Sequence, residues 1–371
     1  MPEWTRTTLD RLVKLRRGHD LPATSRNPGN VPVVGAAGPN GFHDTAIAKA
    51  PGVVVGRAGA SMGHATYCAE DFWPLNTSLY VTDFLGNDPR FVYHLLGGID
   101  FSGYNSGAAQ PMLNRNYITQ IPISLPEPDE QRAIAAVLGA LDDKIAVNER
   151  IAATVDDLAA ALFEDLLTAD SEGAAVLLGD VADVNLRTVK AQDSGSLRYV
   201  DISSVGVGAY EWPEEMPWSD APGRARRKAA LGDTIWSTVR PNRRSHALVL
   251  DTDPGLVFST GLAVISPKTV GPAFLYESTR LASFQTYLES VAEGSAYPAV
   301  RADRFKGAPI ILPPEDARFR FEEMAMPMRL RAHQAQVESR TLATLRDTLL
   351  PQLMSGRLRV KDAEKIVEDH V

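Results

Sequence analysis

An internal repeat constrains this chain more than any other feature of its sequence. Adding 187 to the residue numbers of Ile121–Pro126 gives Ala308–Pro313, and both segments are short apolar runs bounded by proline. The same offset relates three leucines in each of the helical stretches that follow, namely Leu158, Leu162 and Leu166 with Leu345, Leu349 and Leu353. Solenoid repeats have only about 20–45 residues. The chain is therefore predicted to contain one large domain-plus-helix unit twice.

The globular part of each copy is predicted to mix strands and helices. Residues 52–56 and 233–239 are apolar runs of the kind that forms strands, and 91–96 and 274–291 have helical character. The predicted fold class is therefore α+β, with two tandem mixed α/β domains that are each followed by a long helix. The expected segments are a first domain at 1–126, a first helix region at 127–172, a second domain at 173–313, a second helix region at 314–357 and a tail at 358–371.

Both helical stretches carry apolar residues at alternating steps of four and three, which is typical of a coiled-coil seam. The seams occupy equivalent positions of the repeat, so pairing of the two helices as an antiparallel coiled coil is favoured over packing of each helix on its own domain. Asn148 is expected to set the register, and breaks are expected at Gly139-Ala140 and Met326-Pro327, which leaves long helices near 141–168 and 328–354. The expected seam residues are Leu141, Ile145, Asn148, Val155 and Leu162 in the first helix, facing Leu342, Leu345 and Leu349 in the second.

Charge is distributed unevenly along the chain. The formal net charge is −8, whereas residues 127–172 alone carry −9. In contrast, Arg224–His246 carries seven Lys or Arg residues against Asp233 alone, a net charge of +6. Such a basic run is either a solvated loop or a face that binds phosphate, and charge alone does not decide between them.

Several classes of protein find no support in the residues. A single cysteine, Cys68, excludes a disulfide framework and is expected to be a buried small residue. No apolar run approaches the roughly 18 residues of a membrane span, no secretory signal is apparent, and no phosphate loop or paired histidines occur. These features predict a soluble, cytoplasmic protein without a metal site. The carboxylate pairs Asp142-Asp143 and Asp156-Asp157 are expected to be solvated helix faces.

One segment formally matches a serine hydrolase signature. Gly59-Ala-Ser61-Met-Gly63 fits Gly-x-Ser-x-Gly, but the residues after it are a poor helix start, and a nucleophile elbow requires a helix there. A Gly-rich turn is therefore the preferred interpretation. A serine hydrolase using Ser61 is the least favoured alternative.

Residues around the first Pro-bounded strand and its helix resemble the specificity subunits of type I DNA restriction-modification systems. The resemblance rests on Ile121–Pro126, Glu130-Gln131-Arg132 and Leu138–Ile145, and Leu349–Leu358 is similar to the end of the family's second helix. The second copy departs from the pattern, because Arg318-Phe319 replace the Glu-Gln pair.

The resemblance implies a non-catalytic subunit that binds double-stranded DNA. In the family, each target-recognition domain reads half of a bipartite site and the helices form a spacer. Two methyltransferase subunits, which take S-adenosylmethionine, dock on the helices, and two nuclease subunits that use ATP and Mg²⁺ are an optional addition. The complex would be an adenine methyltransferase and ATP-dependent endonuclease. This chain itself would hold no cofactor and contact no membrane. A coiled-coil scaffold without DNA binding is the alternative.

DNA readout requires basic and amide side chains on loops. The residues nominated in the first domain are Arg57, Ser61, His64, Asn105, Gln110, Asn114 and Arg115. Those nominated in the second domain are Arg240, Asn242, Arg243, Arg244, His246, Tyr297 and Arg301. Most of them are expected to contact phosphate rather than bases, because most protein–DNA hydrogen bonds go to the backbone.

Overall fold

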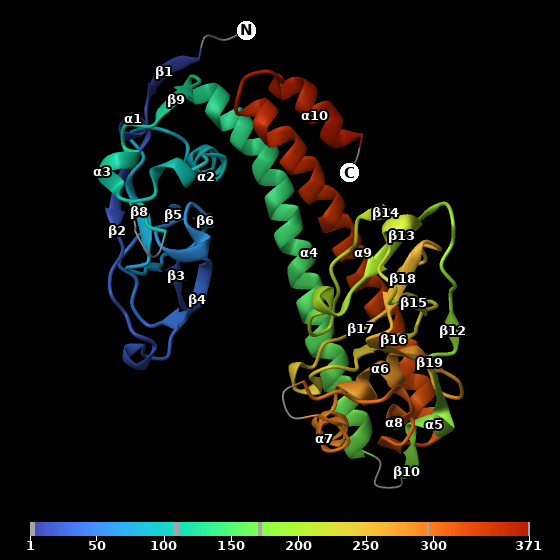
Figure 1. The fold of residues 1–371 in the computed structure, drawn as a ribbon. Helices are drawn as coiled ribbons and strands as arrows, with labels where there is room; N and C mark the ends of the chain where they lie inside the picture. Colours follow the sequence, from blue (N-terminus) through green and yellow to red (C-terminus); the bar gives the residue numbers. More distant parts are fainter. Residues whose placement is uncertain (1–3, 107–110, 170–172, 295–296, 370–371) are drawn as a thin grey trace. The chain divides into compact units, whose positions relative to one another are not determined.

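The structure is a computed structural model that describes residues 4–106, 111–169, 173–294 and 297–369. The chain divides into two compact units, which are described separately (Figure 1). Unit 1 consists of Met1–Val147 and Glu338–Val371, and unit 2 of Asn148–Val337. Both units combine sheets with helices, which confirms the predicted mixed α/β character. Over the described ranges, no helix has the length and apolar character needed to cross a membrane.

Unit 1 contains a four-stranded antiparallel sheet in the order β2-β8-β5-β6 and a three-stranded sheet in the order β4-β3-β7. In the inner strand β5, Val53 and Val55 join the main core while Val54 joins a second cluster, because alternate residues of a strand face opposite sides. The strands are β1 Thr5–Thr8, β2 Lys14–Arg17, β3 Val31–Gly35, β4 Gly38–His43, β5 Gly52–Gly56, β6 Ala65–Cys68, β7 Trp73–Pro74, β8 Ser78–Asp83 and β9 Pro122–Leu125; the short helices are α1 Leu9–Leu12, α2 Pro89–Gly97 and α3 Arg115–Ile118.

Unit 2 contains a four-stranded antiparallel sheet in the order β11-β19-β16-β17 and a five-stranded sheet in the order β12-β15-β18-β13-β14. In the inner strand β16, Trp236 and Ile235 again face different clusters. The strands are β10 Ala174–Leu177, β11 Ala182–Val184, β12 Arg187–Thr188, β13 Ser196–Val200, β14 Glu215–Pro217, β15 Ala225–Lys228, β16 Thr234–Ser237, β17 His246–Leu248, β18 Leu256–Ser259, β19 Leu262–Pro267 and β20 Pro309–Leu312; the short helices are α5 Leu178–Val181, α6 Pro272–Arg280, α7 Ala282–Ser290 and α8 Ala302–Phe305.

The backbone hydrogen bonds of the two units repeat one another. Leu9 N donates to Ile121 O over 3.0 Å in unit 1, and Leu178 N donates to Ala308 O over 2.8 Å in unit 2. Strand β1 pairs antiparallel with β9, and β10 pairs antiparallel with β20. The acceptor residues in these two bonds differ by the 187 positions of the sequence repeat. The internal repeat is therefore a repeat of structure.

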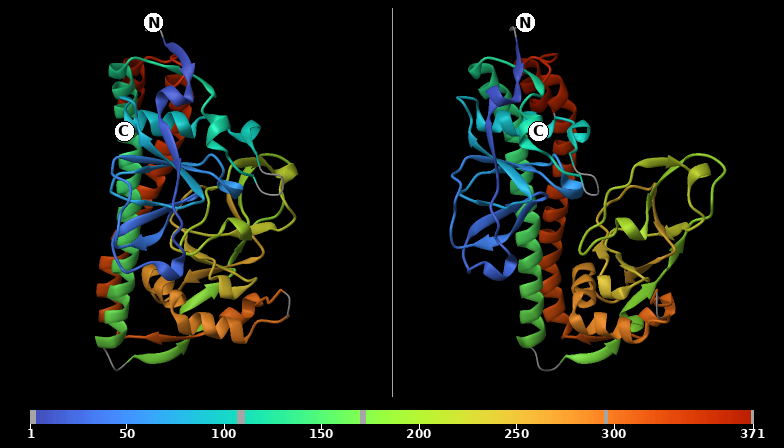
Figure 2. Two further views of the ribbon diagram at one scale, coloured as in Figure 1. Left: turned by 90° about the vertical axis from the view of Figure 1, so that its left-hand side faces the viewer. Right: turned by 60° about the vertical axis from the view of Figure 1, so that its left-hand side comes forward.

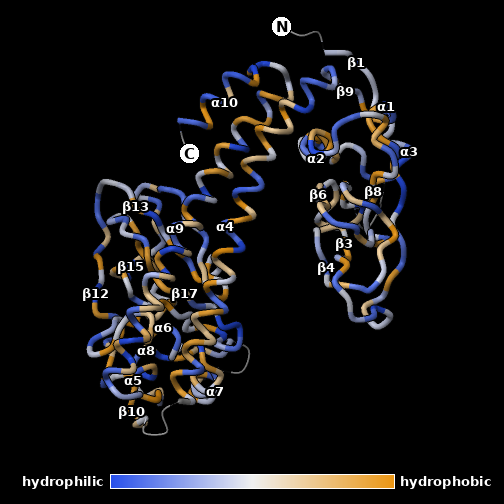
Figure 3. Tube along the Cα trace, turned by 180° about the vertical axis from the view of Figure 1, so that it is seen from behind, coloured by the Kyte–Doolittle hydropathy of each residue, from blue (hydrophilic) through white to orange (hydrophobic). Residues whose placement is uncertain are grey.

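Two long helices, α4 (Pro128–Ala169) and α9 (Glu315–Leu353), contribute to both units. In each unit a stretch of α4 lies beside a stretch of α9 (Figures 1 and 2). Hydrophobic and hydrophilic residues alternate along both helices (Figure 3). Residues 358–371, expected as a tail, contain one more helix, α10 (Val360–Glu368). The fully buried Ala363 of α10 packs into the unit 1 core.

The expected helix breaks are wrong. Helix α4 runs without interruption through Gly139, and α9 runs through Pro327. A Cβ on Gly139 would collide with the side chain of Arg90, so this glycine provides room for a neighbour rather than a break. An interior proline costs a helix about 3 kcal/mol. The buried residues Phe321 and Ala325, before Pro327 on α9, hold the helix against its neighbours and offset this cost.

The seam residues are divided between the units. In unit 1 Leu141 is buried in one cluster with Leu342, Leu345 and Leu349, and Ile145 is partly buried against it. Asn148 is fully buried, and Val155 is partly exposed. The expected contact of Leu162 with Leu342, Leu345 or Leu349 is wrong, because the two helices run antiparallel within each unit. Leu162 instead packs in unit 2 with Phe163, Phe321 and Ala325.

Candidate nucleic-acid interface

In each unit, the segment that follows an inner strand crosses the segment that precedes a short helix. Gly59 N donates to Pro111 O over 3.0 Å in unit 1, and Arg240 N donates to Pro298 O over 2.7 Å at the equivalent place in unit 2. Gly59 and Arg240 both have positive φ angles, 78° and 52°. Glycine adopts this conformation freely, whereas it strains an arginine. Strain at a non-glycine residue is typical of functional turns, which directs attention to the side chains around both crossings.

Four arginines of unit 1 line one open cavity of about 430 Å³ beside this crossing. Arg16 and Arg17 belong to the edge strand β2, Arg57 follows β5, and Arg115 begins α3. No carboxylate lines the cavity, and none of the four arginines forms an ion pair within the part of the chain that the structure describes. The cavity therefore gathers positive charge that nothing in the described protein neutralises.

Arg57 is the most enclosed member of this arginine pocket. Its Nη2 lies 3.2 Å from Sδ of Met112, which holds the side chain against the crossing. Burial, and then the nearby charge of Arg17, lower the pKa of Arg57. The guanidinium stays charged nonetheless, because the ordinary pKa of an arginine lies far above neutral pH. An anion placed among the four groups would relieve their mutual repulsion, and phosphate matches the donor geometry of arginine.

Arg16 and Arg17 were not nominated from the sequence. Together with Lys14 they form a short basic strand that pairs with β8, where Arg16 lies opposite Tyr80 and Arg17 opposite Leu79. A basic segment of this length resembles any solvated edge strand, so only the fold brings it next to Arg57. The available signal was the run of three basic residues in Lys14–Arg17 itself.

Two nominated amides organise the loops of unit 1. Asn114 caps α3, and its Oδ1 accepts a hydrogen bond from the backbone N of Asn116 over 3.0 Å. Oδ1 of Asn105 accepts from the backbone N of Met112, also over 3.0 Å. Both amide oxygens therefore shape the segments that carry Arg57 and Arg115.

The remaining nominated residues of unit 1 lie in or near the glycine-rich turn. Ser61 is half-buried at the end of a 3-10 turn, Gly59–Ser61, and His64 is exposed. The chain continues from Ser61 into β6 and not into a helix. The strand–turn–helix context of a nucleophile elbow is thus missing, and the geometry is that of a Gly-rich turn. Gln110 lies outside the described residues.

Unit 2 presents an exposed basic turn at its crossing. The guanidinium carbon of Arg240 lies 4.6 Å from the ring centroid of Tyr297, a cation–π contact at the surface. Asn242 and Arg243 are exposed on the 3-10 turn Pro241–Arg243. These four side chains make up the outer face of the crossing.

Two nominations in unit 2 need correction. His246 is fully buried, its ring stacked on Trp236 with centroids 5.0 Å apart, so it is not placed to contact DNA. Burial lowers the pKa of His246 to about 4, and the ring is neutral at physiological pH. Arg244 points its guanidinium inward, where Nη2 donates to the backbone O of Arg280 over 2.7 Å. Both residues therefore support the turn and do not form its outer face.

The basic run Arg224–His246 does not form a single surface. Arg226 and Lys228 belong to β15 in the five-stranded sheet, and Nζ of Lys228 donates to backbone carbonyls at 2.5 and 2.8 Å. Arg301 is exposed near the crossing and pairs with Glu293 over 3.1 Å. The exposed face around Arg240 and Arg243 accordingly carries less net charge than the sequence count suggests.

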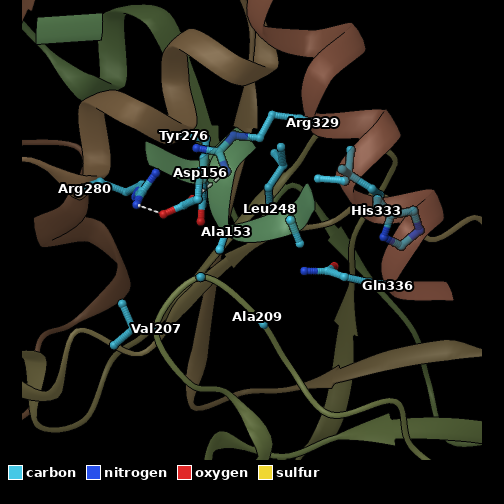
Figure 4. A pocket seen from close by; sticks show the side chains of 14 residues that line it. Ala153, Asp156, Val207, Ala209, Leu248, Tyr276, Arg280, Arg329, His333 and Gln336 are labelled. Carbon is cyan, nitrogen blue, oxygen red and sulfur yellow. Dashed lines mark hydrogen bonds and ion pairs between the residues drawn. The ribbon is translucent and has the colours of Figure 1, made fainter. Parts of the chain in front are cut away.

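Unit 2 also has a cavity, of about 240 Å³, which is bordered by a largely buried ion network (Figure 4). Asp156 accepts from Arg329 and Arg280, both over 2.6 Å, and Arg280 Nη1 lies 3.0 Å from Glu277 Oε2. Arg329 also pairs with Glu277, which is 3% exposed. Both guanidinium groups lie over the ring of Tyr276. The network is neutral in sum and joins α4, α6 and α9, so its role is structural.

The carboxylates expected to be solvated are mostly engaged. Although burial acts to raise it, bonds from the two arginines hold the pKa of Asp156 below its ordinary value. In unit 1 Asp142 pairs with Arg346 over 2.8 Å, and Asp143 accepts two bonds from Arg90. The expectation of solvated faces is therefore wrong for the half-buried Asp142 and Asp156, whereas Asp143 and Asp157 are exposed.

Cys68 is buried, as predicted, and burial raises the pKa of its thiol to about 12, which keeps it protonated and unreactive. Among the described residues, no group of three His, Cys, Asp or Glu side chains is placed to hold a metal ion.

Comparison with known proteins identifies the first part of the chain. Residues 1–156 match the family model described as the type I restriction modification DNA specificity domain. Part of the chain is also similar to the EcoprrI type I specificity subunit of Escherichia coli, with 24% identity over 145 residues, which are 38% of this chain and 36% of that relative. The aligned stretch thus spans about a third of the relative's length.

Solved structures extend the likeness of fold beyond the specificity domain. The type I restriction-modification S subunit of M. genitalium aligns with a TM-score of 0.65 and 16% identity over 95% of this chain and 96% of that one. An HsdS subunit from Thermoanaerobacter tengcongensis aligns with a TM-score of 0.35, a likeness too slight to carry an argument. At 16% identity, the first of these alignments shows a shared fold and no more.

Proposed function

We propose that the chain is a DNA-specificity subunit whose two units each read one half of a bipartite double-stranded DNA site. The observation that supports this most strongly is the paired crossing, at Gly59 in unit 1 and Arg240 in unit 2, with exposed basic side chains around both. A specificity domain over residues 1–156 and a second unit that repeats its hydrogen bonds extend the assignment to the whole chain.

In this proposal the two crossings differ in how they hold DNA. The arginine pocket of unit 1 contacts phosphates through Arg16, Arg17 and Arg115, while the half-buried Arg57 is the best oriented for a base edge. In unit 2, Arg243 and Asn242 reach the groove, and Arg240 is held by Tyr297. Arginine pairs bidentately with guanine, and asparagine with adenine.

The remaining parts of the proposal follow the family. Helices α4 and α9 form an antiparallel coiled-coil spacer on which two methyltransferase subunits dock, with two nuclease subunits in a restriction complex. S-adenosylmethionine, ATP and Mg²⁺ would be held by those partners and not by this chain, which is a non-catalytic, cytoplasmic subunit. The assembled complex would methylate adenine and cleave DNA with ATP.

Salt-dependent DNA binding tests the proposal against a scaffold that does not bind DNA. Affinity for a labelled duplex is measured by fluorescence anisotropy over a series of salt concentrations. Replacing Arg16 and Arg17 with alanine should flatten the slope of log affinity against log salt by roughly 0.9 per phosphate contact removed, about 1.8 in all. Arg132→Ala is the matched control, because Arg132 is an exposed arginine of the same unit. Absence of binding by the unaltered chain with its partners, or an unchanged slope, would refute the proposal.

A further inference from the structure

The four arginines of the unit 1 pocket are replaced at the equivalent positions of unit 2, although the backbone there is the same. Arg57 follows β5, and its backbone O accepts a hydrogen bond from Leu113 N over 2.8 Å. Thr238 follows β16, and its backbone O accepts from Val300 N over 2.7 Å. The 187-residue offset relates Leu113 to Val300. A threonine therefore stands in unit 2 where Arg57 stands in unit 1.

The edge strands differ in the same sense. Arg16 lies opposite Tyr80, and the backbone N of Asn185 donates to Val264 O over 2.7 Å. Tyr80 and Val264 both occupy the third position of their strands, β8 and β19, so Asn185 takes the place of Arg16. Its φ angle of 59° turns the chain away from the strand, which continues into β12 of the other sheet. The edge of unit 2 therefore ends before the place of Arg17.

The fourth arginine, Arg115, is replaced by an alanine. Arg115 is the first residue of α3, and the 187-residue offset relates it to Ala302, the first residue of α8. Near the crossing of unit 2, Arg301 is paired with a glutamate over 3.1 Å, and the basic side chains on the outer face are Arg240 and Arg243. Unit 1, in contrast, gathers four arginines in one cavity of about 430 Å³ that no carboxylate lines.

We propose that unit 1 anchors the chain on DNA, with its arginine pocket holding backbone phosphates of one half-site, whereas unit 2 holds the other half-site with few phosphate contacts. The inference rests on the proposed function, which gives each unit one half of the site. Arginine matches the geometry of phosphate, and a concave site lined by one sign of charge attracts its ligand from a distance. Unit 1 therefore also makes the first encounter with DNA. Unit 2 depends on base contacts for its share of the affinity.

Ethylation interference tests the unequal distribution of phosphate contacts. The full-length chain and its purified methyltransferase subunit are bound to a duplex with the site that the complex methylates and with sparsely ethylated phosphates. Ethylation removes the charge of a phosphate and blocks binding where the protein needs it. The triple variant Arg16→Ala/Arg17→Ala/Arg115→Ala should lose this sensitivity at about one phosphate per arginine, all in one half-site. Arg240→Ala/Arg243→Ala should lose it at fewer phosphates, in the other half-site.

An exchange of equivalent residues tests the comparison of the units directly. Arg115→Ala gives unit 1 the residue of unit 2 and should flatten the slope of log affinity against log salt by roughly 0.9. Ala302→Arg gives unit 2 the residue of unit 1 and should steepen that slope by roughly the same amount. Neither side chain is buried, so both variants should fold, which circular dichroism checks. Ala191→Arg, at an exposed alanine of unit 2 in the loop between β12 and β13, is the matched control for added charge.

The outcomes separate this inference from the proposed function. If the unaltered complex does not bind DNA, the proposed function fails, and the anchor fails with it. If the complex binds DNA but the unit 2 variant loses as many phosphate contacts as the unit 1 variant, only the anchor is overturned. A slope for Ala302→Arg no steeper than that of Ala191→Arg would also overturn it, because the equivalent surface of unit 2 would then not face the DNA backbone.

Discussion

Replacing Arg329 with alanine should destabilise unit 2 strongly. Arg329 is 8% exposed, and its side chain bridges Asp156 of α4 and Glu277 of α6. Its removal leaves the carboxylate of Glu277, itself 3% exposed, with Arg280 as its remaining partner. Breaking a buried ion pair from one side costs about 3–5 kcal/mol, because the other charge stays desolvated. We expect a loss near the lower end, about 3 kcal/mol, since Arg280 retains part of the compensation.

The loss should also depend on pH in a defined direction. Burial raises the pKa of Glu277 above its ordinary value of 4.5, against the opposing effect of both arginines. When the pKa of a carboxyl group is higher in the folded state than in the unfolded state, the folded protein becomes less stable as the pH rises between these two values. Without Arg329 the pKa rises further, so Arg329→Ala should be more destabilised at pH 8 than at pH 5.

Urea unfolding followed by tryptophan fluorescence measures both effects. Changing Trp4 and Trp73, which lie in unit 1, to phenylalanine leaves the signal to Trp212, Trp218 and Trp236 of unit 2.

Two further variants serve as a rescue and a control for Arg329→Ala. The double variant Glu277→Leu/Arg329→Met should recover most of the loss, because apolar residues of similar volume replace buried ion pairs with little cost. Arg320→Ala, which removes an exposed pair with Asp316 on the same helix, should change stability by less than about 0.5 kcal/mol. A loss below about 1 kcal/mol in Arg329→Ala, or a double variant no more stable than the single one, would refute the reasoning.

Two more variants probe the packing of the helices and the outer face of the unit 2 crossing. Phe163→Ala should cost unit 2 about 3–5 kcal/mol in the same unfolding assay, since its ring contacts those of Phe274 and Phe321 with centroids 5.4 Å apart in both cases; a smaller loss would mean that the site collapses around the cavity. Arg243→Ala should reduce affinity by about 1–3 kcal/mol and relax preference at one position of the second half-site if it reads a base, or weaken all sequences alike if it contacts phosphate. Wild-type binding and specificity of that variant would remove Arg243 from the interface.

The sequence repeat predicted the architecture because it fixes the spacing between equivalent residues. Residues at equivalent positions then make the same backbone hydrogen bonds in both units. Leu9 and Leu178, near the start of the two repeat copies, donate the same backbone bond to the residue before the Pro-bounded strand. The expected helix breaks were wrong because local propensity was the only available signal. Gly139 and Pro327 both weaken an isolated helix, but tertiary packing decides at each position, and the Arg90 side chain that fills the space beside Gly139 is 49 residues away in sequence.

The candidate interface was predictable to a different degree in the two units. Arg240 and Arg243 stand in a dense basic run directly after a strand, so their exposed turn could be anticipated from charge and turn residues. His246 belongs to the same run, yet its ring stacks on Trp236. No charge count distinguishes a residue on the inward face of β17 from its neighbours. Arg16 and Arg17 join Arg57 only through the sheet, because β2 and β5 both pair with β8.

At one position of the repeat the two long helices carry opposite charges, and this difference should disfavour the pairing of two copies of the same helix. In unit 1 Asp142 of α4 pairs with Arg346 of α9 over 2.8 Å. The residue that the 187-residue offset relates to Asp142 is Arg329, which pairs in unit 2 with Asp156 of α4 over 2.6 Å. If a second copy of α4 took the place of α9 in unit 2, its Asp142 would stand where Arg329 stands, opposite Asp156. Two carboxylates would then face each other at a largely buried position, and like charges placed together there are repulsive. Two copies of α9 would likewise set Arg329 against Arg346. The apolar seams lie at equivalent positions of the repeat, so the charge difference between Asp142 and Arg329 adds a preference for pairing α4 with α9.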